Sequence, residues 1–408
     1  MQEIISQDSF STLLLCSFVN PSENIDKGYK PFKQKEWVDL STKIAKSELE
    51  RPSNLIKYSH HQIMEILRIS DVEAERILTL LSRSSSMALQ VEKFNSMGIR
   101  IITRADQEYP KRFKKILKSL SPNILYVAGD LSILNSDAIG IVGSRNANED
   151  SLKFTELLTE KAVKEGLVTV SGGSKGIDSV AHNKTLELNG KTIAILSDGL
   201  ASFIKKKDNL KNILNRNLLV ISPYHPNARF YPYTALDRNK YIYALSKLTI
   251  ATSSDYKKGG TWSGAVENLK NKWVPIYIRK DVQSKGLSEL EKLGAVTLTF
   301  DELKDPSFIQ LINSQINVCC DSQYKTLESE SIYKLVWPII EKHLKKPISI
   351  KKLSEELDLE EIQLLSWLNR AKKEEKVVFL NIEIVISSTF YNPEMDSFKQ
   401  LGLFEIKN

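Results

Sequence analysis

A glycine-rich turn over residues 171–178, Ser-Gly-Gly-Ser-Lys-Gly-Ile-Asp, has the residue types that bind an anion. It follows an apolar, strand-like run at 167–170 and precedes a helix-like stretch. A helix that begins at such a turn has unpaired backbone N–H groups, and its dipole adds positive potential there. Lys175 adds a full positive charge. The turn therefore predicts a phosphate site, either for a nucleotide or for a nucleic-acid backbone.

A second strand-like run, 138–142, ends in Gly143-Ser144-Arg145. Glycine lets a ligand approach the backbone closely, and the guanidinium of Arg145 matches the geometry of a phosphate. A glycine turn with a surface arginine is the alternative interpretation. The carboxyl ends of neighbouring parallel strands meet at one edge of a sheet, so this segment and the 171–178 turn together favour one anion-binding cleft.

The motifs of common nucleotide enzymes are not matched. Lys175 lies outside the Gly-x-x-x-x-Gly-Lys-Ser/Thr frame of a P-loop, and no Gly-x-Gly-x-x-Gly follows the 138–142 run. The five histidines and three cysteines show no spacing typical of metal ligands. We therefore predict no ATPase chemistry, no dinucleotide, no metal and no cofactor.

Two carboxylates are candidates for acid–base chemistry. Asp178 and His182 lie four residues apart on one expected helix, where they could act as an acid–base pair. The favoured interpretation is that Asp178 lies at the positive helix end and His182 packs locally. Glu267 ends the segment 259–267, Gly-Gly-Thr-Trp-Ser-Gly-Ala-Val-Glu, and a helix-surface glutamate is the favoured interpretation there. Gly260 and Thr261 of this segment form a further wall of the expected pocket.

Basic and aromatic residues alternate between positions 205 and 240, which is what a groove for a single nucleic-acid strand needs. The basic residues are Lys205, Lys206, Lys207, Lys211, Arg216, Arg238 and Lys240, and the rings are Tyr224, His225, Phe230, Tyr231 and Tyr233. About half of the rings are expected in the core, and solvated charge is the alternative for the basic residues. The predicted DNA and phosphate ligands are Gly143, Ser144, Arg145, Ser171, Gly172, Gly173, Ser174, Lys175, Arg238, Lys240, Gly260 and Thr261.

Composition agrees with a globular protein that has a polyanionic partner. The chain has 408 residues, 41% of them hydrophobic, and a formal net charge of +7. Its three cysteines include the adjacent pair Cys319 and Cys320, which is typical of a reduced, cytoplasmic protein. The apolar run at 13–18 is too short to span a bilayer, so no membrane segment is predicted.

The order of the elements predicts an α/β fold with flanking domains. Strand-like runs alternate with helix-length segments, which favours a Rossmann-like, doubly wound, mostly parallel sheet. We expect a helical N-terminal module over 1–85, the core over 86–305, a linker over 306–330, a winged-helix domain over 331–390 and a tail over 391–408. In the winged helix, four glutamates nearly cancel the basic residues near the third helix, so protein contact or architecture is favoured over major-groove binding.

Together these segments resemble the DNA-processing protein A (DprA/Smf) family over about residues 98–300. The motifs that carry the resemblance are Tyr109-Pro110, 142–145, 171–178 with Ala181-His182, 237–240 and Gly260-Thr261. The resemblance implies a Rossmann-like core that binds single-stranded DNA without catalysis. It also implies a homodimer that delivers a RecA-type recombinase to the strand in transformation or recombination. By position, Arg145 and Lys175 would clamp phosphates, while Gly143, Ser144 and residues 172–174 would shape the pocket.

The chain departs from the family pattern at several positions. Ser174 replaces the usual alanine, and the usual Arg-Asn-Arg reads Arg238-Asn239-Lys240. The related lysine-decarboxylase-like (LOG) hydrolases share this core and carry Gly-Gly-x-Gly-Thr-x-x-Glu, of which Glu267 is kept but the threonine is not. A LOG-like nucleotide-binding protein or nucleoside-monophosphate phosphoribohydrolase is therefore the second hypothesis. An anti-phage defence or nucleotide-sensing module is the third.

Overall fold

The computed structural model describes residues 5–280, 283–304, 332–359, 361–380 and 384–391. The chain divides into two compact units, Met1–Asn317 and Val318–Asn408. Cys319, Cys320, the predicted linker over 306–330, the 381–383 turn and all but the first residue of the predicted tail lie outside the described residues. Every helix among the described residues is too short or too polar to cross a membrane.

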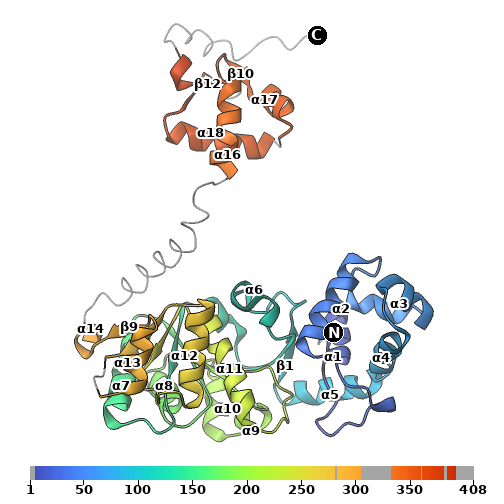
Figure 1. The fold of residues 1–408 in the computed structure, drawn as a ribbon, viewed down its shortest axis with the longest axis vertical. Helices are drawn as coiled ribbons and strands as arrows, with labels where there is room; N and C mark the ends of the chain where they lie inside the picture. Colours follow the sequence, from blue (N-terminus) through green and yellow to red (C-terminus); the bar gives the residue numbers. More distant parts are fainter. Residues whose placement is uncertain (1–4, 281–282, 305–331, 360, 381–383, 392–408) are drawn as a thin grey trace. The chain divides into compact units, whose positions relative to one another are not determined.

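A large twisted sheet forms the centre of the first unit (Figure 1). Within the described residues its strand order is β1-β2-β6-β5-β4-β3-β7-β8-β9. In this spatial order, each strand from β6 through β5, β4, β3, β7 and β8 to β9 is parallel to its neighbours in that run. Strand β2 is antiparallel to both β6 and β1. The predicted mostly parallel α/β sheet is therefore confirmed. The strands are β1 (Arg100–Thr103), β2 (Ile124–Ala128), β3 (Ala138–Val142), β4 (Val168–Gly172), β5 (Thr192–Ile195), β6 (Leu218–Ser222), β7 (Leu248–Ala251), β8 (Ile276–Arg279) and β9 (Val296–Leu298).

Helices cover both faces of this sheet. One face packs against α6 (Lys111–Leu117), α11 (Pro232–Leu245), α12 (Gly259–Asn271) and α13 (Lys285–Lys292). The other packs against α7 (Glu149–Lys164), α8 (Ile177–Glu187) and α14 (Phe300–Lys304), and against α9 (Ala201–Ile204) and α10 (Lys207–Leu214) beside β5 and β6. Successive strand residues face opposite sides, as Ile193 and Ala194 of β5 do. Coverage of both faces explains why the strand sequences are apolar at nearly every position.

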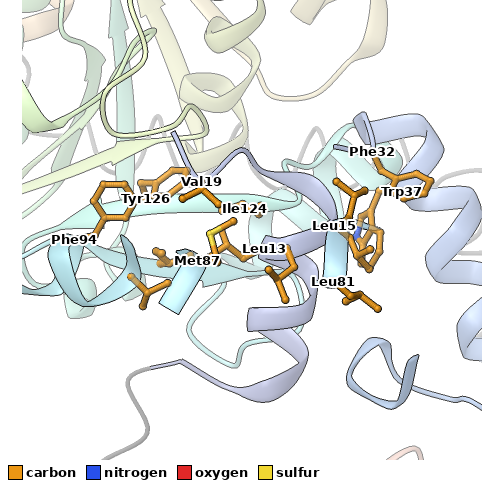
Figure 2. Close-up of a cluster of buried hydrophobic side chains, with 14 of the residues drawn as sticks. Leu13, Leu15, Val19, Phe32, Trp37, Leu81, Met87, Phe94, Ile124 and Tyr126 are labelled. Carbon is orange, nitrogen blue, oxygen red and sulfur yellow. The ribbon is translucent and has the colours of Figure 1, made fainter. Parts of the chain in front are cut away.

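The N-terminal helices share a hydrophobic core with the sheet. Leu13 and Met87 lie with Phe94 against Ile124 and Tyr126 of β2, as Figure 2 shows. The predicted boundary near residue 85 therefore does not coincide with a gap in the packing, and that boundary stays a prediction. The elements before β1 are α1 (Gln7–Cys16), η1 (Asp26–Gly28), α2 (Gln34–Lys46), η2 (Pro52–Lys57), α3 (His60–Leu67), α4 (Asp71–Leu81) and α5 (Ser84–Ser96); η3 (Lys118–Leu120) and η4 (Leu131–Asn135) follow it.

The second unit has its own small core. Trp337, Leu353, Leu368 and Val385 are buried together in it. The predicted pairing of the last two strands is present, and a short strand before α17, which the sequence did not predict, joins them in the order β10-β12-β11. The winged-helix assignment of this unit stays a prediction. Its elements are α16 (Ile332–His343), β10 (Ile348–Ser349), α17 (Ile350–Leu357), α18 (Glu361–Lys373), β11 (Val377–Phe379), β12 (Ile384–Ser387) and η5 (Ser388–Phe390).

Candidate nucleic-acid interface

A cleft opens at the carboxyl ends of β3 and β7. These strands are neighbours, but the chain leaves β3 toward β4 on one side and leaves β7 toward β8 on the other. Doubly wound sheets bind ligands at such a point. The cavity measures about 510 Å³ and is bordered by the loop after β3, the turn before α8, the first turns of α11 and the start of α12. A volume of roughly 300–1,000 Å³ is usual for a small-molecule site.

The two glycine segments expected at neighbouring strand ends do come together. A Cβ atom on Gly143 would lie 2.3 Å from Ile177 Cγ1, so only glycine fits against the start of α8. Gly176 has a φ of +81°, and a Cβ atom there would lie 2.5 Å from the Ser144 carbonyl oxygen. The Ser144 N–H donates to Ser253 Oγ at 2.8 Å, which ties the loop after β3 to β7. These contacts hold Ser144 and Arg145 at the wall of the cleft.

The start of α8 differs from the open N–H cradle expected from the sequence. Asp178 folds back toward the turn, and its Oδ2 accepts from the Ser174 N–H at 3.4 Å. The Ile177 N–H points to the Ser144 carbonyl oxygen at 3.5 Å. One N–H group of the turn and one at the helix start therefore already have acceptors in the chain. Of the expected ligands in this turn, Ser174 lines the cleft, whereas exposed Lys175 does not.

The other predicted residues of the turn have packing roles. Ser171 is buried at the end of β4, where its Oγ donates to the Ile141 carbonyl at 2.6 Å. Gly173 packs against Leu196, whose Cδ2 would lie 2.4 Å from a Cβ at that position. Gly172 faces the side chains of Arg238 and Asp178, and a Cβ atom on it would lie 1.9 Å from Arg238 Nη1 and 2.4 Å from Asp178 Oδ2. A glycine at position 172 thus makes room for both groups.

Arg238 and Lys240 are buried, which rules out the alternative that both are solvated surface charges. Their exposed fractions are 3% and 8%, because the middle of α11 packs against the sheet. Lys240 forms an ion pair with Asp237 and does not line the cleft. Arg238 does line it, and its Nε and Nη1 atoms have no hydrogen-bond partner among the residues that the structure describes. Burial raises the pKa of the neighbouring Asp178 carboxyl, against the opposing effects of Arg238 and His182.

His182 forms hydrogen bonds inside the fold. This agrees with the favoured interpretation, in which His182 packs locally. Its Nε2 lies 2.7 Å from the Gly172 carbonyl oxygen, and its Nδ1 lies 2.7 Å from Thr192 Oγ1. A carbonyl can only accept, so Nε2 carries the proton and Nδ1 is left as an acceptor. Burial lowers the pKa of this imidazole. His182 is thus a buried neutral histidine that holds the end of β4.

This arrangement predicts a loss of stability in mild acid. Below about pH 6.5 an unfolded histidine takes up a proton, whereas buried His182 resists protonation because its folded pKa is lowered. The free energy of unfolding should therefore fall by up to about 1.4 kcal/mol per pH unit for this residue. Urea titrations of wild type, His182→Gln and the exposed control His61→Gln at pH 7.5 and 5.5 measure the effect. A wild-type pH dependence retained in full by His182→Gln would refute it.

Three exposed rings lie in succession where the chain enters α11, and we call Phe230, Tyr231 and Tyr233 the aromatic shelf. Their exposed fractions are 45%, 48% and 66%. The guanidinium carbon of Arg145 lies 5.5 Å from the Phe230 ring centroid, and the two tyrosine rings stack with centroids 5.5 Å apart. Phe230 lines the cleft.

The remaining two rings of this stretch are packed. Tyr224 Oη lies 3.1 Å from the Thr234 carbonyl and from Asp237, and the His225 ring meets Phe94 and Tyr126 edge-on. About half of the rings were expected in the core; Tyr224 and His225 are instead half-buried, and Phe230, Tyr231 and Tyr233 are exposed.

Helix α12 begins at Gly259, the first residue of the glycine-rich segment 259–267. Gly260 and Thr261 therefore lie in its first turn, and both line the cleft. Lys258 at the N-cap also lines the cleft and was missed by the sequence reasoning. A lysine directly before two helix-start glycines was the signal that could have found it. Among the other candidates, Lys205, Lys206, Lys207, Lys211 and Arg216 are exposed outside the cavity lining.

Glu267 lies two turns into α12 and does not line the cleft. Burial raises the pKa of its carboxyl, with Lys240 acting in the opposite direction. In a LOG-like hydrolase this glutamate would have to reach the ligand. Its position among the described residues therefore disfavours that hypothesis.

Residues 100–304 match the family model of DNA recombination-mediator protein A. The chain belongs to this family. The DNA processing protein DprA of Streptococcus pneumoniae is 30% identical over 216 residues, which are 52% of this chain and 74% of that protein. DprA of Bacillus subtilis is 27% identical over 168 residues, 41% of this chain and 56% of that protein. The match covers the sheet and its helices, and it places this chain in DNA processing and recombination.

The recombination-mediator fold is also seen in a solved structure. The X-ray structure of DprA from Streptococcus pneumoniae superposes with a TM-score of 0.50 at 21% identity, covering 67% of this chain and 97% of that chain. This likeness supports the fold. The residues that line the cleft at the ends of β3 and β7 all lie within the part of the chain that matches the family model.

Proposed function

We propose that this protein binds single-stranded DNA at the mouth of the cleft, without catalysis, and acts in recombination. The observation that carries the proposal is the placement of Arg145 over Phe230 next to the exposed Tyr231–Tyr233 stack. Aromatic side chains bind unpaired bases by stacking, and arginine binds the phosphates between them. Because duplex DNA keeps its bases stacked on each other, this combination favours a single strand.

Other residues would extend this contact. Exposed Lys175 and the lysines at 205–207 lie on the chain segments after β4 and β5, at the same edge of the sheet as the cleft, whereas Lys211 lies within α10 and Arg216 precedes β6 at the opposite edge. The lysines at the cleft edge would follow the phosphates by charge. The wall of the cleft would be shaped by Gly143, Ser144 and residues 172–174. Lys240 would position Asp237. Deeper in the cleft, the contacts would come from Arg238, Gly260 and Thr261.

The whole-chain role is proposed from the family. We infer a homodimer that brings a RecA-type recombinase to the bound strand, with the N-terminal helical module and the C-terminal winged helix as accessory domains. In the second unit, Arg370 and Lys376 pair with Glu374. This pairing favours a protein-contact or architectural role for that unit over duplex binding.

Replacing Phe230 by alanine tests the aromatic shelf. Loss of one stacked base should raise the dissociation constant of a 20-nucleotide oligothymidine by about fivefold or more. Leu89→Ala is the matched control, because Leu89 is 69% exposed on α5 and lies outside the cleft. Fluorescence anisotropy of a labelled strand gives both constants. Equal affinity of Phe230→Ala and wild type would remove the shelf from the proposed interface.

A further inference from the structure

The deep part of the cleft holds a buried cation, two of whose nitrogens lack a hydrogen-bond partner within the described residues. Arg238 is 3% exposed and lines the cavity, yet within the described part of the chain its Nε and Nη1 have no hydrogen-bond partner. Such a charge is costly inside a protein, and native structures nearly always satisfy it. Asp178 lies beside it against Gly172, but no hydrogen bond joins the carboxylate to those two nitrogens. The guanidinium is therefore placed to receive an anion.

The amino end of α12 meets the same cavity. This helix has 13 residues, and Lys258 at its N-cap gives its N–H groups no side-chain hydrogen bond. Gly260 and Thr261 of its first turn line the cavity. Asn239 Nδ2 donates to the Gly260 carbonyl at 2.9 Å and fixes this turn beside Arg238 in α11. Free N–H groups and the helix dipole add to the attraction for an anion.

The charges around the cavity leave a positive surplus. Arg145, Arg238 and Lys258 face Asp178 and Asp255, so three cations oppose two carboxylates. Asp255 is engaged by the Ser144 hydroxyl at 3.4 Å. The amino end of α12 adds further positive potential.

The floor of the cavity consists of buried side chains. Val142, Ile242 and Tyr243 line it and are 5%, 1% and 1% exposed. A phosphodiester continues into a nucleotide on both sides. The interior of a strand therefore cannot pass through such a floor. A phosphomonoester ends the chain and carries a second negative charge, with a second pKa of about 6.

We propose that the deep part of the cleft binds a phosphomonoester, carried by the end of a DNA strand or by a free nucleotide. This inference rests on the proposed function, because the strand itself would lie on the aromatic shelf at the mouth. Arg238 and the first turn of α12 would bind the terminal phosphate, while Arg145 and Phe230 hold the adjoining nucleotide.

The test compares three internally labelled 20-nucleotide strands of one sequence: a 5′-phosphate, a 3′-phosphate, and hydroxyl groups at both ends. At pH 7.5 one phosphorylated strand should bind wild type at least about fivefold more tightly than the hydroxyl strand, since charge-assisted hydrogen bonds to a dianion are added. The preference should shrink at pH 5, where the monoester loses one charge. Equal dissociation constants for all three strands overturn the inference. Failure of the hydroxyl strand to bind at all overturns the proposed function instead.

Competition separates the two sources of the phosphate. Displacement of the phosphorylated strand by thymidine monophosphate, but not by thymidine, assigns the site to free nucleotides as well. A retained end preference without displacement assigns it to strand ends. Arg238→Gln should bring the ratio of the two dissociation constants to about one, Arg238→Lys should keep part of it, and the exposed control Arg51→Gln should keep it all. A full preference in a folded Arg238→Gln protein would also overturn the inference.

Discussion

Replacing Arg145 by alanine is expected to raise the dissociation constant for a 20-nucleotide single strand by about 10- to 100-fold, the usual effect of losing charge-assisted hydrogen bonds. Arg145 is exposed, lines the cleft and lies over the Phe230 ring. Its removal would take away a phosphate ligand and the group that covers the stacking ring. The slope of log affinity against log salt should also fall by about 0.7, the value for one phosphate contact on a single strand.

Two further variants make this prediction specific. Arg145→Lys keeps the charge but not the planar fork, so it should recover the salt slope and only part of the affinity. Arg51→Ala removes an exposed arginine outside the cleft and should change neither. An Arg145→Ala protein that binds within twofold of wild type would mean that the mouth of the cleft is not the interface.

Replacing Gly172 by alanine is expected to reduce both stability and DNA affinity. The new methyl group would lie 1.9 Å from Arg238 Nη1 and 2.4 Å from Asp178 Oδ2, so both buried groups must move. Overpacking of this kind costs about 1–3 kcal/mol. The displaced arginine would also disturb the cleft wall formed by α11. Urea unfolding and strand-binding anisotropy on the same samples measure both effects.

The neighbouring glycine gives the matched control. A methyl group on Gly173 would meet Leu196 Cδ2 at 2.4 Å, the end of a flexible side chain that can rotate away. Gly173→Ala should therefore cost less than Gly172→Ala. The double variant Gly172→Ala/Arg238→Ala should regain only part of the stability, because the clash with Arg238 is removed while that with Asp178 remains, and it should not regain binding. Wild-type stability and affinity in Gly172→Ala would show that the contact with Arg238 is unimportant.

The strands of the sheet could be read from the sequence because their pattern is simple. The runs at 138–142 and 248–251 coincide with β3 and β7, since apolar, β-branched segments bounded by polar turns are typical of buried parallel strands. The placement of the cleft followed from the alternation of strands and helices. The packing of the N-terminal helices against β2 did not, because contacts between distant segments leave no local pattern.

The site was predicted in position but not in detail. The run Asp237-Arg238-Asn239-Lys240 has the composition of a solvated surface, yet α11 lies against the sheet and buries three of the four residues. The start of α12 cannot be located from helix propensity, because Gly259 and Gly260 are poor helix formers. The inward turn of Asp178 depends on its approach to Ser174, which spacing alone cannot reveal.

The most direct test of strand binding at the aromatic shelf compares wild-type affinity for three ligands of equal length: single-stranded oligothymidine, the same backbone without bases, and duplex DNA. All three present phosphates, but only the first offers unpaired bases to Phe230, Tyr231 and Tyr233. We expect the oligothymidine to bind at least about tenfold more tightly than either of the others at about 150 mM salt, through stacking of one or more bases. Equal affinity for the strand with and without bases would contradict base stacking as the source of strand recognition.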